Sequence, residues 1–193
     1  MQKINLFDFD KTIYDGDSTI DFYLYCLRRQ PKLILALPRQ MLAFVRYAFG
    51  IIGKNQWKEG FFSFLTRARN VDSLVLRFWE SHEKKIKSFY LEMEHSSDVV
   101  ISASPEFLLA PICAKLGVKA LIATKVDQKS GRLLGKNCRG TEKVSRLKEQ
   151  FPDCRVLCAY SDSLTDLPML NLAEQAYLIR GEKRIPCDNQ TGL

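Results

Sequence analysis

Five short apolar runs, separated by stretches with helical spacing or by polar turns, restrict the fold of this sequence more than any other feature. Continuous apolar runs of this length are typical of strands that are buried on both faces, and strands that alternate with helices are typical of a parallel sheet. We therefore predict an α/β fold with a Rossmann-like, doubly wound parallel sheet. The expected strands are Lys3–Phe9, Asp98–Ser104, Val118–Thr124, Cys154–Tyr160 and Ala176–Arg180.

One long segment interrupts this alternation. From about Ile20 to Tyr90, apolar residues recur at intervals of three and four, which predicts helices. We interpret residues 19–90 as a helical cap that is inserted into a core formed by residues 1–18 and 91–193. Elsewhere in the core the sequence predicts a hairpin at Lys125–Gly135, an irregular tail at Gly181–Leu193, and helices at Pro105–Leu116, Thr141–Gln150 and Thr165–Leu172.

The composition is that of a globular protein, with 46% hydrophobic and 26% charged residues. Its six cysteines form no dense framework, and the two nearest, Cys154 and Cys158, match neither the common redox spacing nor a four-ligand zinc pattern. The charged strand that begins at Lys3 argues against a cleavable export signal. We therefore expect a reduced protein of the cytoplasm.

The positive charge of the chain is concentrated in one segment. Between Arg28 and Arg69 there are nine basic residues and a single acid, Glu59, so these 42 residues carry a net charge of +8, while the rest of the chain carries −1 of the total of +7. Such a concentration favours an anionic partner, namely a phosphorylated substrate, an acidic membrane surface or nucleic acid. The segment contains no recognisable nucleic-acid motif, so we do not expect nucleic acid to be the partner.

Within this basic segment, Leu33–Ile52 is a run of twenty residues with only two charges, Arg39 and Arg46. Its length could cross a bilayer, but the two arginines and Pro38 argue against an ordinary spanning helix. Lys32, Arg39 and Arg46 are spaced by seven, which places them on one stripe of a helix that is otherwise apolar. This pattern predicts a helix that lies in an anionic membrane interface, at the inner face of the membrane; the alternatives are a buried cap helix and a dimer contact.

Polar and acidic side chains follow the predicted strands. In an open parallel sheet the carboxyl ends of the strands form the ligand-binding edge, so these side chains are expected to converge there. Several carboxylates in one cleft repel each other unless a cation joins them, and oxygen ligands without histidine or cysteine favour Mg2+ over zinc. The residues concerned are Asp8, Asp10, Ser102, Asp162 and Asp166, together with Lys143 at the start of a predicted helix.

These residues fall into four motifs that resemble the motif set of the haloacid dehalogenase superfamily of phosphohydrolases. The motifs are DFDKT (Asp8–Thr12), Ser102 after an apolar strand, Lys143, and SDSLTD (Ser161–Asp166). The chain departs from the family pattern at Ser161 and Ala103, where many relatives have glycine, and both residues are small enough for a backbone N–H to approach a phosphate. The resemblance implies a Mg2+-dependent phosphatase, that is, a phosphoric monoester hydrolase.

The resemblance also implies the chemical roles of three aspartates. Asp8 is the expected nucleophile, which forms an aspartyl-phosphate, and Asp10 is the expected general acid and base. Mg2+ is expected to be held by the carboxylates of Asp8 and Asp162 and by the carbonyl of Asp10, where it would offset the repulsion between nucleophile and phosphate.

Further residues of the motifs are expected to bind the phosphate or to support the site. Asp166 is expected in the outer shell of the metal or beside Lys143, and Thr12 is expected to brace the loop. Ser104 is the alternative to Ser102 as a phosphate ligand. The expected phosphate ligands are Ser102, Ala103 and Lys143.

The insertion between the first two motifs resembles the helical cap of the phosphoserine-phosphatase-like branch, in which the cap closes over the site and selects the substrate. The favoured substrate is a lipid phosphate such as phosphatidylglycerophosphate, because the chain is locally similar to the phosphatidylglycerophosphatase C proteins of bacteria. One alternative is a cytosolic phosphatase of a small metabolite such as phosphoserine, in which Asp15 or Asp17 would lie near the amine of the substrate. The other alternative is a non-catalytic anion-binding module. The local similarity lies at Leu27–Pro31, Leu37, Pro38, Glu142–Val144 and Tyr160–Leu170.

Overall fold

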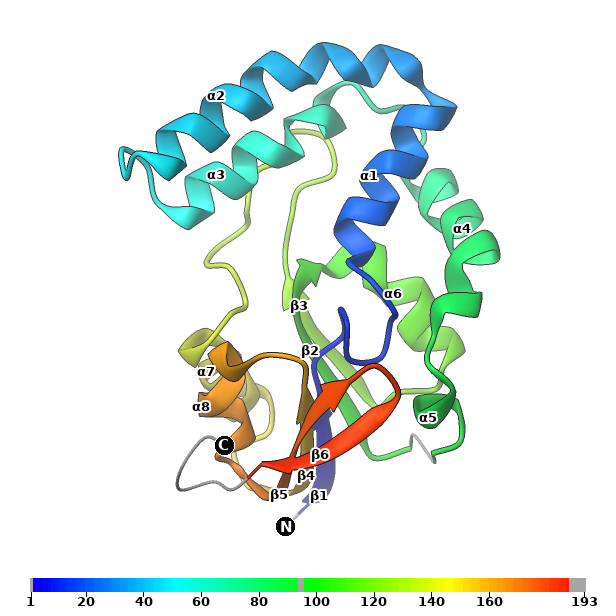
Figure 1. Ribbon diagram of the computed structural model, residues 1–193, viewed down its shortest axis with the longest axis vertical. Helices are drawn as coiled ribbons and strands as arrows, with labels where there is room; N and C mark the ends of the chain where they lie inside the picture. Colours follow the sequence, from blue (N-terminus) through cyan, green and yellow to red (C-terminus); the bar gives the residue numbers. More distant parts are fainter. Residues whose placement is uncertain (1, 94–95, 188–193) are drawn as a thin grey trace.

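The computed structural model describes residues 2–93 and 96–187, and its central feature is one sheet of six strands (Figure 1). The strand order is β3-β2-β1-β4-β5-β6, and all neighbouring strands are parallel except β5 and β6. This arrangement confirms the predicted α/β fold. The strands are β1 (Gln2–Phe7), β2 (Asp98–Pro105), β3 (Ala120–Thr124), β4 (Cys154–Ser161), β5 (Ala173–Arg180) and β6 (Lys183–Cys187).

Helices cover both faces of the sheet, which explains why its central strands are apolar throughout. The helices of this part of the chain are α6 (Glu106–Lys115), α7 (Thr141–Gln150), the 3-10 helix η4 (Leu164–Asp166) and α8 (Leu167–Leu170). Leu6 and Phe7 are neighbours in β1 but belong to two separate hydrophobic cores. The core of Leu6 includes Leu147 of α7 and Met169 of α8, whereas the core of Phe7 includes Leu108 of α6.

The chain between β1 and β2 confirms the predicted helices. We call Ser18–Leu91 the helical segment. In Figure 1, its helices α2 and α3 lie side by side above the carboxyl ends of the parallel strands, and α4 runs down one side near α6. The elements are α1 (Ser18–Arg29), η1 (Pro31–Ala36), α2 (Leu37–Ala48), α3 (Lys54–Phe61), η2 (Phe62–Thr66), α4 (Val71–His82), η3 (Glu83–Lys85) and α5 (Ser88–Leu91).

Helix α2 is attached to its neighbours along a narrow stripe of two buried residues, Gln40 and Ala43. The side-chain oxygen of Gln40 accepts a hydrogen bond from the hydroxyl of Tyr23 (2.7 Å), and its amide nitrogen donates to the carbonyl of Phe61 (2.7 Å). Ala43 packs on Gly60 of α3 so closely that a Cβ added at Gly60 would lie 2.2 Å from the Cβ of Ala43. Small residues therefore allow α2 and α3 to approach each other.

The run Leu33–Ile52 does not form one helix. It divides between η1 and α2, and Pro38 lies in the first turn of α2, where its missing N–H costs no hydrogen bond. Lys32 lies in η1, so only Arg39 and Arg46 share one stripe of α2, and the prediction of one helical stripe for all three is wrong. In the described part of the chain, no helix is long and apolar enough to reach across a bilayer.

The end of the chain is more regular than the sequence predicts. Lys183–Cys187, expected in an irregular tail, form β6 and pair with β5 in antiparallel fashion. Gly181 has a φ of 59°, and this left-handed conformation makes the tight turn between the two strands. Residues 188–193 of the predicted tail lie outside the described residues.

Two other predicted elements are shorter than expected. The hairpin at Lys125–Gly135 is reduced to one isolated bridge between Val126 and Leu133. The helix predicted at Thr165–Leu172 consists of η4 followed by the four residues of α8. Pro168 lies in the first turn of α8. Because proline has no backbone N–H, it cannot donate the hydrogen bond that would join η4 and α8 into one continuous helix.

Candidate active site

The predicted site residues meet at the carboxyl ends of three adjacent strands. Asp8 follows β1, Ser102 lies near the end of β2, and Asp162 follows β4. Together with Lys143 and other residues they line a cavity of about 240 Å³, which we call the strand-end cavity. Of the eight predicted site residues, only Thr12 does not line this cavity. The seven that do are Asp8, Asp10, Ser102, Ala103, Lys143, Asp162 and Asp166.

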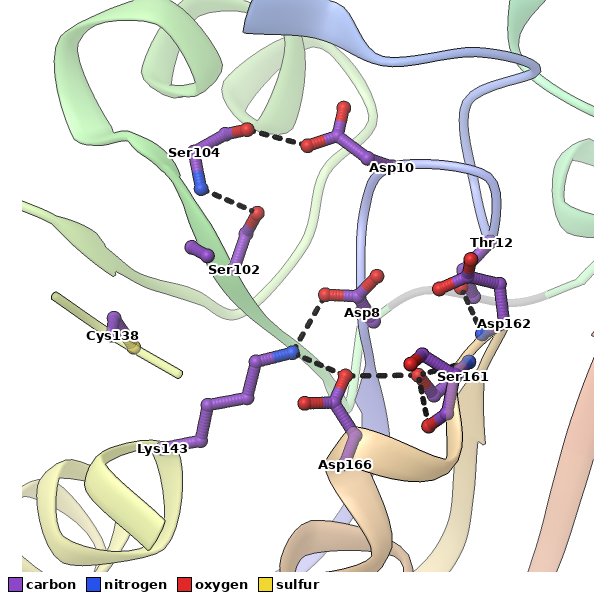
Figure 2. Close-up of polar contacts among 12 residues, drawn as sticks. Asp8, Asp10, Thr12, Ser102, Ser104, Cys138, Lys143, Ser161, Asp162 and Asp166 are labelled. Atoms are coloured by element: carbon purple, nitrogen blue, oxygen red, sulfur yellow. Dashed lines mark hydrogen bonds and ion pairs between the residues drawn. The ribbon is translucent and has the colours of Figure 1, made fainter. Parts of the chain in front are cut away.

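Lys143 lies between two carboxylates. Its buried ammonium group donates hydrogen bonds to Oδ1 of Asp8 (2.6 Å) and to Oδ2 of Asp166 (2.7 Å) (Figure 2). Burial raises the pKa of Asp8 to about 7, against the opposing effect of Lys143. Burial also disfavours the charged form of Lys143, but the two carboxylates outweigh it and hold the pKa of Lys143 above its usual value. Lys143 therefore remains a cation next to Asp8.

The loop that carries Asp162 is fixed by hydroxyl groups. The hydroxyl of Thr12 accepts a hydrogen bond from the amide of Asp162 (2.9 Å), which joins the loops after β1 and β4. The hydroxyl of Ser161 donates to Oδ2 of Asp166 (2.9 Å). Ser161, which the sequence marks only as a departure from the family pattern, thus helps to hold the carboxylate that faces Lys143.

The carboxylate of Asp10 points away from Asp8 (Figure 2). Its oxygens accept hydrogen bonds from the amide of Ser18 (2.7 Å) and from the hydroxyl of Ser104. Burial, reinforced by the nearby charge of Asp17, raises the pKa of Asp10. Asp10 also lines a second cavity, of about 270 Å³, which lies beneath α3 and which we call the α3 cavity.

The two candidate serines are separated by this arrangement. Ser102 lines the strand-end cavity, and its hydroxyl oxygen accepts a hydrogen bond from the amide of Ser104 (3.0 Å). Ser104 lines the α3 cavity and donates its hydroxyl hydrogen to Asp10. Only Ser102 therefore shares a cavity with Asp8 and Lys143.

The oxygen atoms of the strand-end cavity suit a hard divalent cation. Among the described residues, neither Oδ2 of Asp8 nor the carboxylate of Asp162 accepts a hydrogen bond or forms an ion pair. In residues 2–93 and 96–187, three or more acidic, histidine or cysteine side chains are nowhere grouped as a metal site. A cation would therefore take these two carboxylates and complete its shell with backbone carbonyls and water, as Mg2+ does.

Two lysines that the sequence analysis does not single out also contact the site. Lys58 of α3 donates hydrogen bonds to Oδ1 of Asn137 (2.7 Å) and to the carbonyl of Ala103, and burial lowers its pKa to about 8. Lys87 donates to the carbonyls of Lys11 and Gly181. Nothing in the local sequence distinguishes either lysine from its exposed neighbours, because both contacts depend on tertiary packing.

The match to a known family agrees with this geometry. A sequence model described as haloacid dehalogenase-like hydrolase matches residues 6–171 of the chain. The chain belongs to the haloacid dehalogenase-like hydrolase family. The matched range contains all four motifs and the whole helical segment.

Two curated relatives match part of this haloacid dehalogenase-like hydrolase. Protein CicA of Caulobacter vibrioides is 42% identical over 83 residues, which are 40% of this chain and 37% of CicA. A Mycobacterium tuberculosis protein named as a probable phosphatase is 33% identical over 93 residues, which are 44% of this chain and 32% of that protein. The matched part thus spans about a third of the length of each relative.

Solved structures of other proteins share the fold of this haloacid dehalogenase-like hydrolase. A protein of unknown function from Bordetella pertussis has a TM-score of 0.74 and 22% identity, with coverage of 92% of this chain and 90% of that one. A protein from Vibrio cholerae described as a probable phosphoserine phosphatase, in unliganded form, has a TM-score of 0.65 and 13% identity, with coverage of 91% of this chain and 55% of that one. At these identities the similarity concerns the fold alone.

Proposed function

We propose that this haloacid dehalogenase-like hydrolase is a Mg2+-dependent phosphomonoester hydrolase that acts through an aspartyl-phosphate on Asp8. The observation that carries the proposal is the buried ammonium of Lys143 between Asp8 and Asp166, beside the free Oδ2 of Asp8. Lys143 thus favours the charged form of Asp8 that can attack phosphorus, and the same carboxylate keeps one oxygen free of protein donors. A solvated helix lysine or a turn aspartate would not need such an arrangement.

The reaction follows from the positions of Asp8 and Asp10. The carboxylate of Asp8 attacks the phosphorus of the ester, the P–O bond to the alcohol breaks, and Asp10 gives its proton to the departing oxygen. The resulting Asp10 carboxylate then takes a proton from water, which attacks the phosphorus and releases phosphate and Asp8. The raised pKa of Asp10, caused by burial, favours the protonated form that the first step requires.

The transferred phosphoryl group needs donors for its oxygens. Lys143 supplies a positive charge, and the hydroxyl of Ser102 can donate its hydrogen because that group acts as an acceptor toward Ser104. Ala103 lines the same cavity, and we propose its backbone N–H as a further donor. Mg2+, held by the carboxylates of Asp8 and Asp162 and the carbonyl of Asp10, would neutralise the charge that builds up between nucleophile and phosphate.

The division of the chain supports a site that is covered from one side. We propose that residues 19–90 act as a cap over a core formed by residues 1–18 and 91–193. In its support, Lys58 and Asp10 line one cavity although they come from the helical segment and the core. Substrate selection then depends on the residues that the helical segment places above Asp10.

The favoured substrate is a lipid phosphate such as phosphatidylglycerophosphate, and the surface of α2 supports this choice. Large apolar side chains cover its outward face and the turns at its ends, with exposed fractions of 65% at Leu35, 79% at Phe49 and 64% at Ile51. Arg39 and Arg46 flank this face on one side and are exposed. The other exposed apolar residues of the face are Ile34, Leu37, Met41, Leu42, Phe44 and Val45.

An anionic bilayer is the partner that fits this face. A wide apolar surface with cations at its edge can insert shallowly while the arginines reach lipid phosphates. Peripheral binding at the cytoplasmic side of a membrane would bring the α2–α3 pair, and with it the cavity beneath α3, close to a lipid substrate. The local resemblance to phosphatidylglycerophosphatase C proteins points the same way.

A phosphatase of a small metabolite such as phosphoserine is the second candidate. The observation that favours it is Asp17, whose carboxylate lines both cavities and could hold an amine. Asp15 does not line either cavity.

A phosphatase assay tests both candidates. The protein is given phosphatidylglycerophosphate in anionic vesicles or phosphoserine in solution, each with Mg2+ and with EDTA, and Asp8→Asn serves as the inactive control. We expect Mg2+-dependent release of phosphate, faster from the lipid, and none from the folded Asp8→Asn variant. Activity that persists in Asp8→Asn would contradict the aspartyl-phosphate, and preference for phosphoserine would replace the lipid as substrate.

A further inference from the structure

The α3 cavity holds three cations around a site next to Asp10. They are Lys54 and Lys58 of α3 and Arg139, which precedes α7. Among the described residues, the side chains of Lys54 and Arg139 form no hydrogen bond and no ion pair. Three positive groups that converge on one cavity repel each other, and negative charges among them reduce this repulsion.

The two acids of the α3 cavity, Asp10 and Asp17, reduce its positive charge but do not cancel it, because three cations line the cavity. Both carboxylate oxygens of Asp10 already accept hydrogen bonds, from Ser18 and Ser104. Asp17 caps the start of α1 by accepting a hydrogen bond from the amide of Ile20 (3.0 Å). Lys58 donates to Asn137 and Ala103, which are uncharged acceptors, and within residues 2–93 and 96–187 it forms no ion pair.

The α3 cavity and the strand-end cavity share Asp10, Asp17, Ala103 and Arg139. If Asp10 protonates the departing oxygen, the alcohol attached to that oxygen must extend from Asp10 away from Asp8. The α3 cavity lies in that direction, since Asp10 turns its carboxylate toward Ser104, which lines it (Figure 2). Whatever the alcohol carries will therefore lie among Lys54, Lys58 and Arg139.

We propose that the α3 cavity binds a second anionic group, carried by the alcohol that the reaction releases, and that Lys58 and Arg139 recognise it. This inference rests on the proposed phosphatase function, because that function gives the alcohol its direction. The substrate is then a phosphomonoester with a second negative charge, either a phosphodiester, as in a lipid headgroup, or a carboxylate. Trp57 and Phe61 supply an apolar wall of the same cavity for the carbon atoms between the two charges.

Binding measurements on the Asp8→Asn protein test the inference without turnover. Three soluble probes are titrated by calorimetry with Mg2+ present: glycerol 1-phosphate, whose alcohol is uncharged; 3-phosphoglycerate, whose alcohol carries a carboxylate; and glycerophosphoglycerol phosphate, whose alcohol carries a phosphodiester. The quantity compared is the ratio of the affinity for a two-anion probe to the affinity for glycerol 1-phosphate. The larger ratio identifies the source of the second anion.

In the Asp8→Asn protein we expect this affinity ratio to be at least about tenfold. Adding Lys58→Gln or Arg139→Gln should remove most of this preference for two-anion probes, because charged hydrogen bonds to an anion are strong. Lys136→Gln, on the same loop as Arg139 but outside both cavities, is the matched control and should keep the ratio. Asn137→Ala removes an acceptor of Lys58 but leaves its charge, so it should also keep the ratio. Equal loss in Asn137→Ala and Lys58→Gln would mean that Lys58 only attaches α3 to the core.

A ratio near one in Asp8→Asn, or a ratio that neither Lys58→Gln nor Arg139→Gln lowers, would overturn the inference. Hydrolysis of the same three probes by the unsubstituted protein is measured separately. If it hydrolyses none of them while the binding ratio depends on Lys58 and Arg139, the anion site stands and the phosphatase proposal fails.

Discussion

Ser161 and Lys143 donate hydrogen bonds to the same oxygen, Oδ2 of Asp166, at 2.9 and 2.7 Å. The hydroxyl of Ser161 therefore fixes the carboxylate that in turn orients the ammonium beside Asp8. The glycine that the family pattern favours at this position could not donate such a bond. In this chain a residue at the end of β4 thus supports the position of a lysine on α7.

Replacing Ser161 by alanine tests this positioning role. Since a single hydrogen bond contributes about 1 kcal/mol, we expect kcat to fall about five- to tenfold while KM changes little. Steady-state kinetics with a soluble phosphomonoester measure both constants. Ser145→Ala is the control, because Ser145 is exposed on α7 and donates only to the carbonyl of Thr141 (3.3 Å). An unchanged kcat in Ser161→Ala would show that Lys143 holds Asp166 without help.

Asp10→Asn separates the two steps of the proposed reaction. An asparagine cannot protonate the departing oxygen, but nitrophenolate needs little protonation and leaves readily. With 4-nitrophenyl phosphate we expect a burst of about one nitrophenolate per protein, followed by slow turnover, because the aspartyl-phosphate forms but lacks its general base. With an alkyl phosphate we expect no burst. Stopped-flow absorbance measures the burst, and its absence with the aryl ester would contradict the role of Asp10 in the second step.

The positions of Asp8, Ser102 and Asp162 could be predicted from the sequence because each follows an apolar run, and adjacent parallel strands end at the same edge. Lys58 could not be predicted in this way. Its contact with Ala103 joins residues 45 positions apart in the chain, and it depends on how α3 lies over the sheet. In the sequence, Lys58 is one of nine basic residues in a segment whose other cations face solvent or the same cavity.

Strand β6 was not predicted from the sequence, for a different reason. Its residues Lys183, Arg184, Ile185 and Pro186 are exposed, so the run lacks the apolar pattern that marks the central strands. An edge strand pairs through its backbone on one side only and needs no buried face. The charges and the proline on this edge also discourage pairing with another chain.

Gly60→Ala tests the close approach of α2 and α3. The added Cβ would lie 2.2 Å from that of Ala43, so the helices must separate. Overpacking of this kind costs about 1–3 kcal/mol, against a gain of up to about 1 kcal/mol from alanine in a helix. We expect urea unfolding to show a net loss of stability, and Ala43→Gly in the same protein should recover part of it. Independent, additive effects of the two substitutions would contradict the contact.

The recognition of a second anion should weaken at alkaline pH. Burial lowers the pKa of Lys58 to about 8, while the nearby charges of Asp10 and Asp17 act in the opposite direction without restoring the usual value. The ammonium is therefore present below pH 8 and is lost as the pH rises through that value. We expect the affinity ratio of two-anion to one-anion probes to fall between pH 7 and 9 in the Asp8→Asn protein.

The control for this pH dependence is Lys58→Arg in the same background. Arginine stays charged throughout this range, so the ratio should no longer fall. A decline that persists in Lys58→Arg would have to come from another group, and a ratio constant to pH 10 would show that Lys58 titrates as an ordinary lysine.

The proposed membrane contact would depend on charges at the edge of the apolar face of η1 and α2. Lys32, Arg39 and Arg46 are all exposed, and each cation near an anionic surface contributes about 1 kcal/mol to binding. Replacing all three by glutamine should therefore weaken binding to anionic vesicles at least tenfold, and high salt should have the same effect on the unsubstituted protein. Vesicle co-sedimentation at low and high salt measures both.

The matched control replaces three exposed lysines of the core, Lys119, Lys148 and Lys183, by glutamine, which changes the net charge by the same amount. This variant should bind vesicles nearly as well as the parent if the contact is made by α2, since its substitutions leave the apolar face and its arginines in place. Hydrolysis of a short soluble phosphomonoester should be the same in both triple variants, because the strand-end cavity is untouched in either. Equal binding of the two variants at low salt would mean that only the overall charge attracts the protein, and the small-metabolite phosphatase would become the leading candidate.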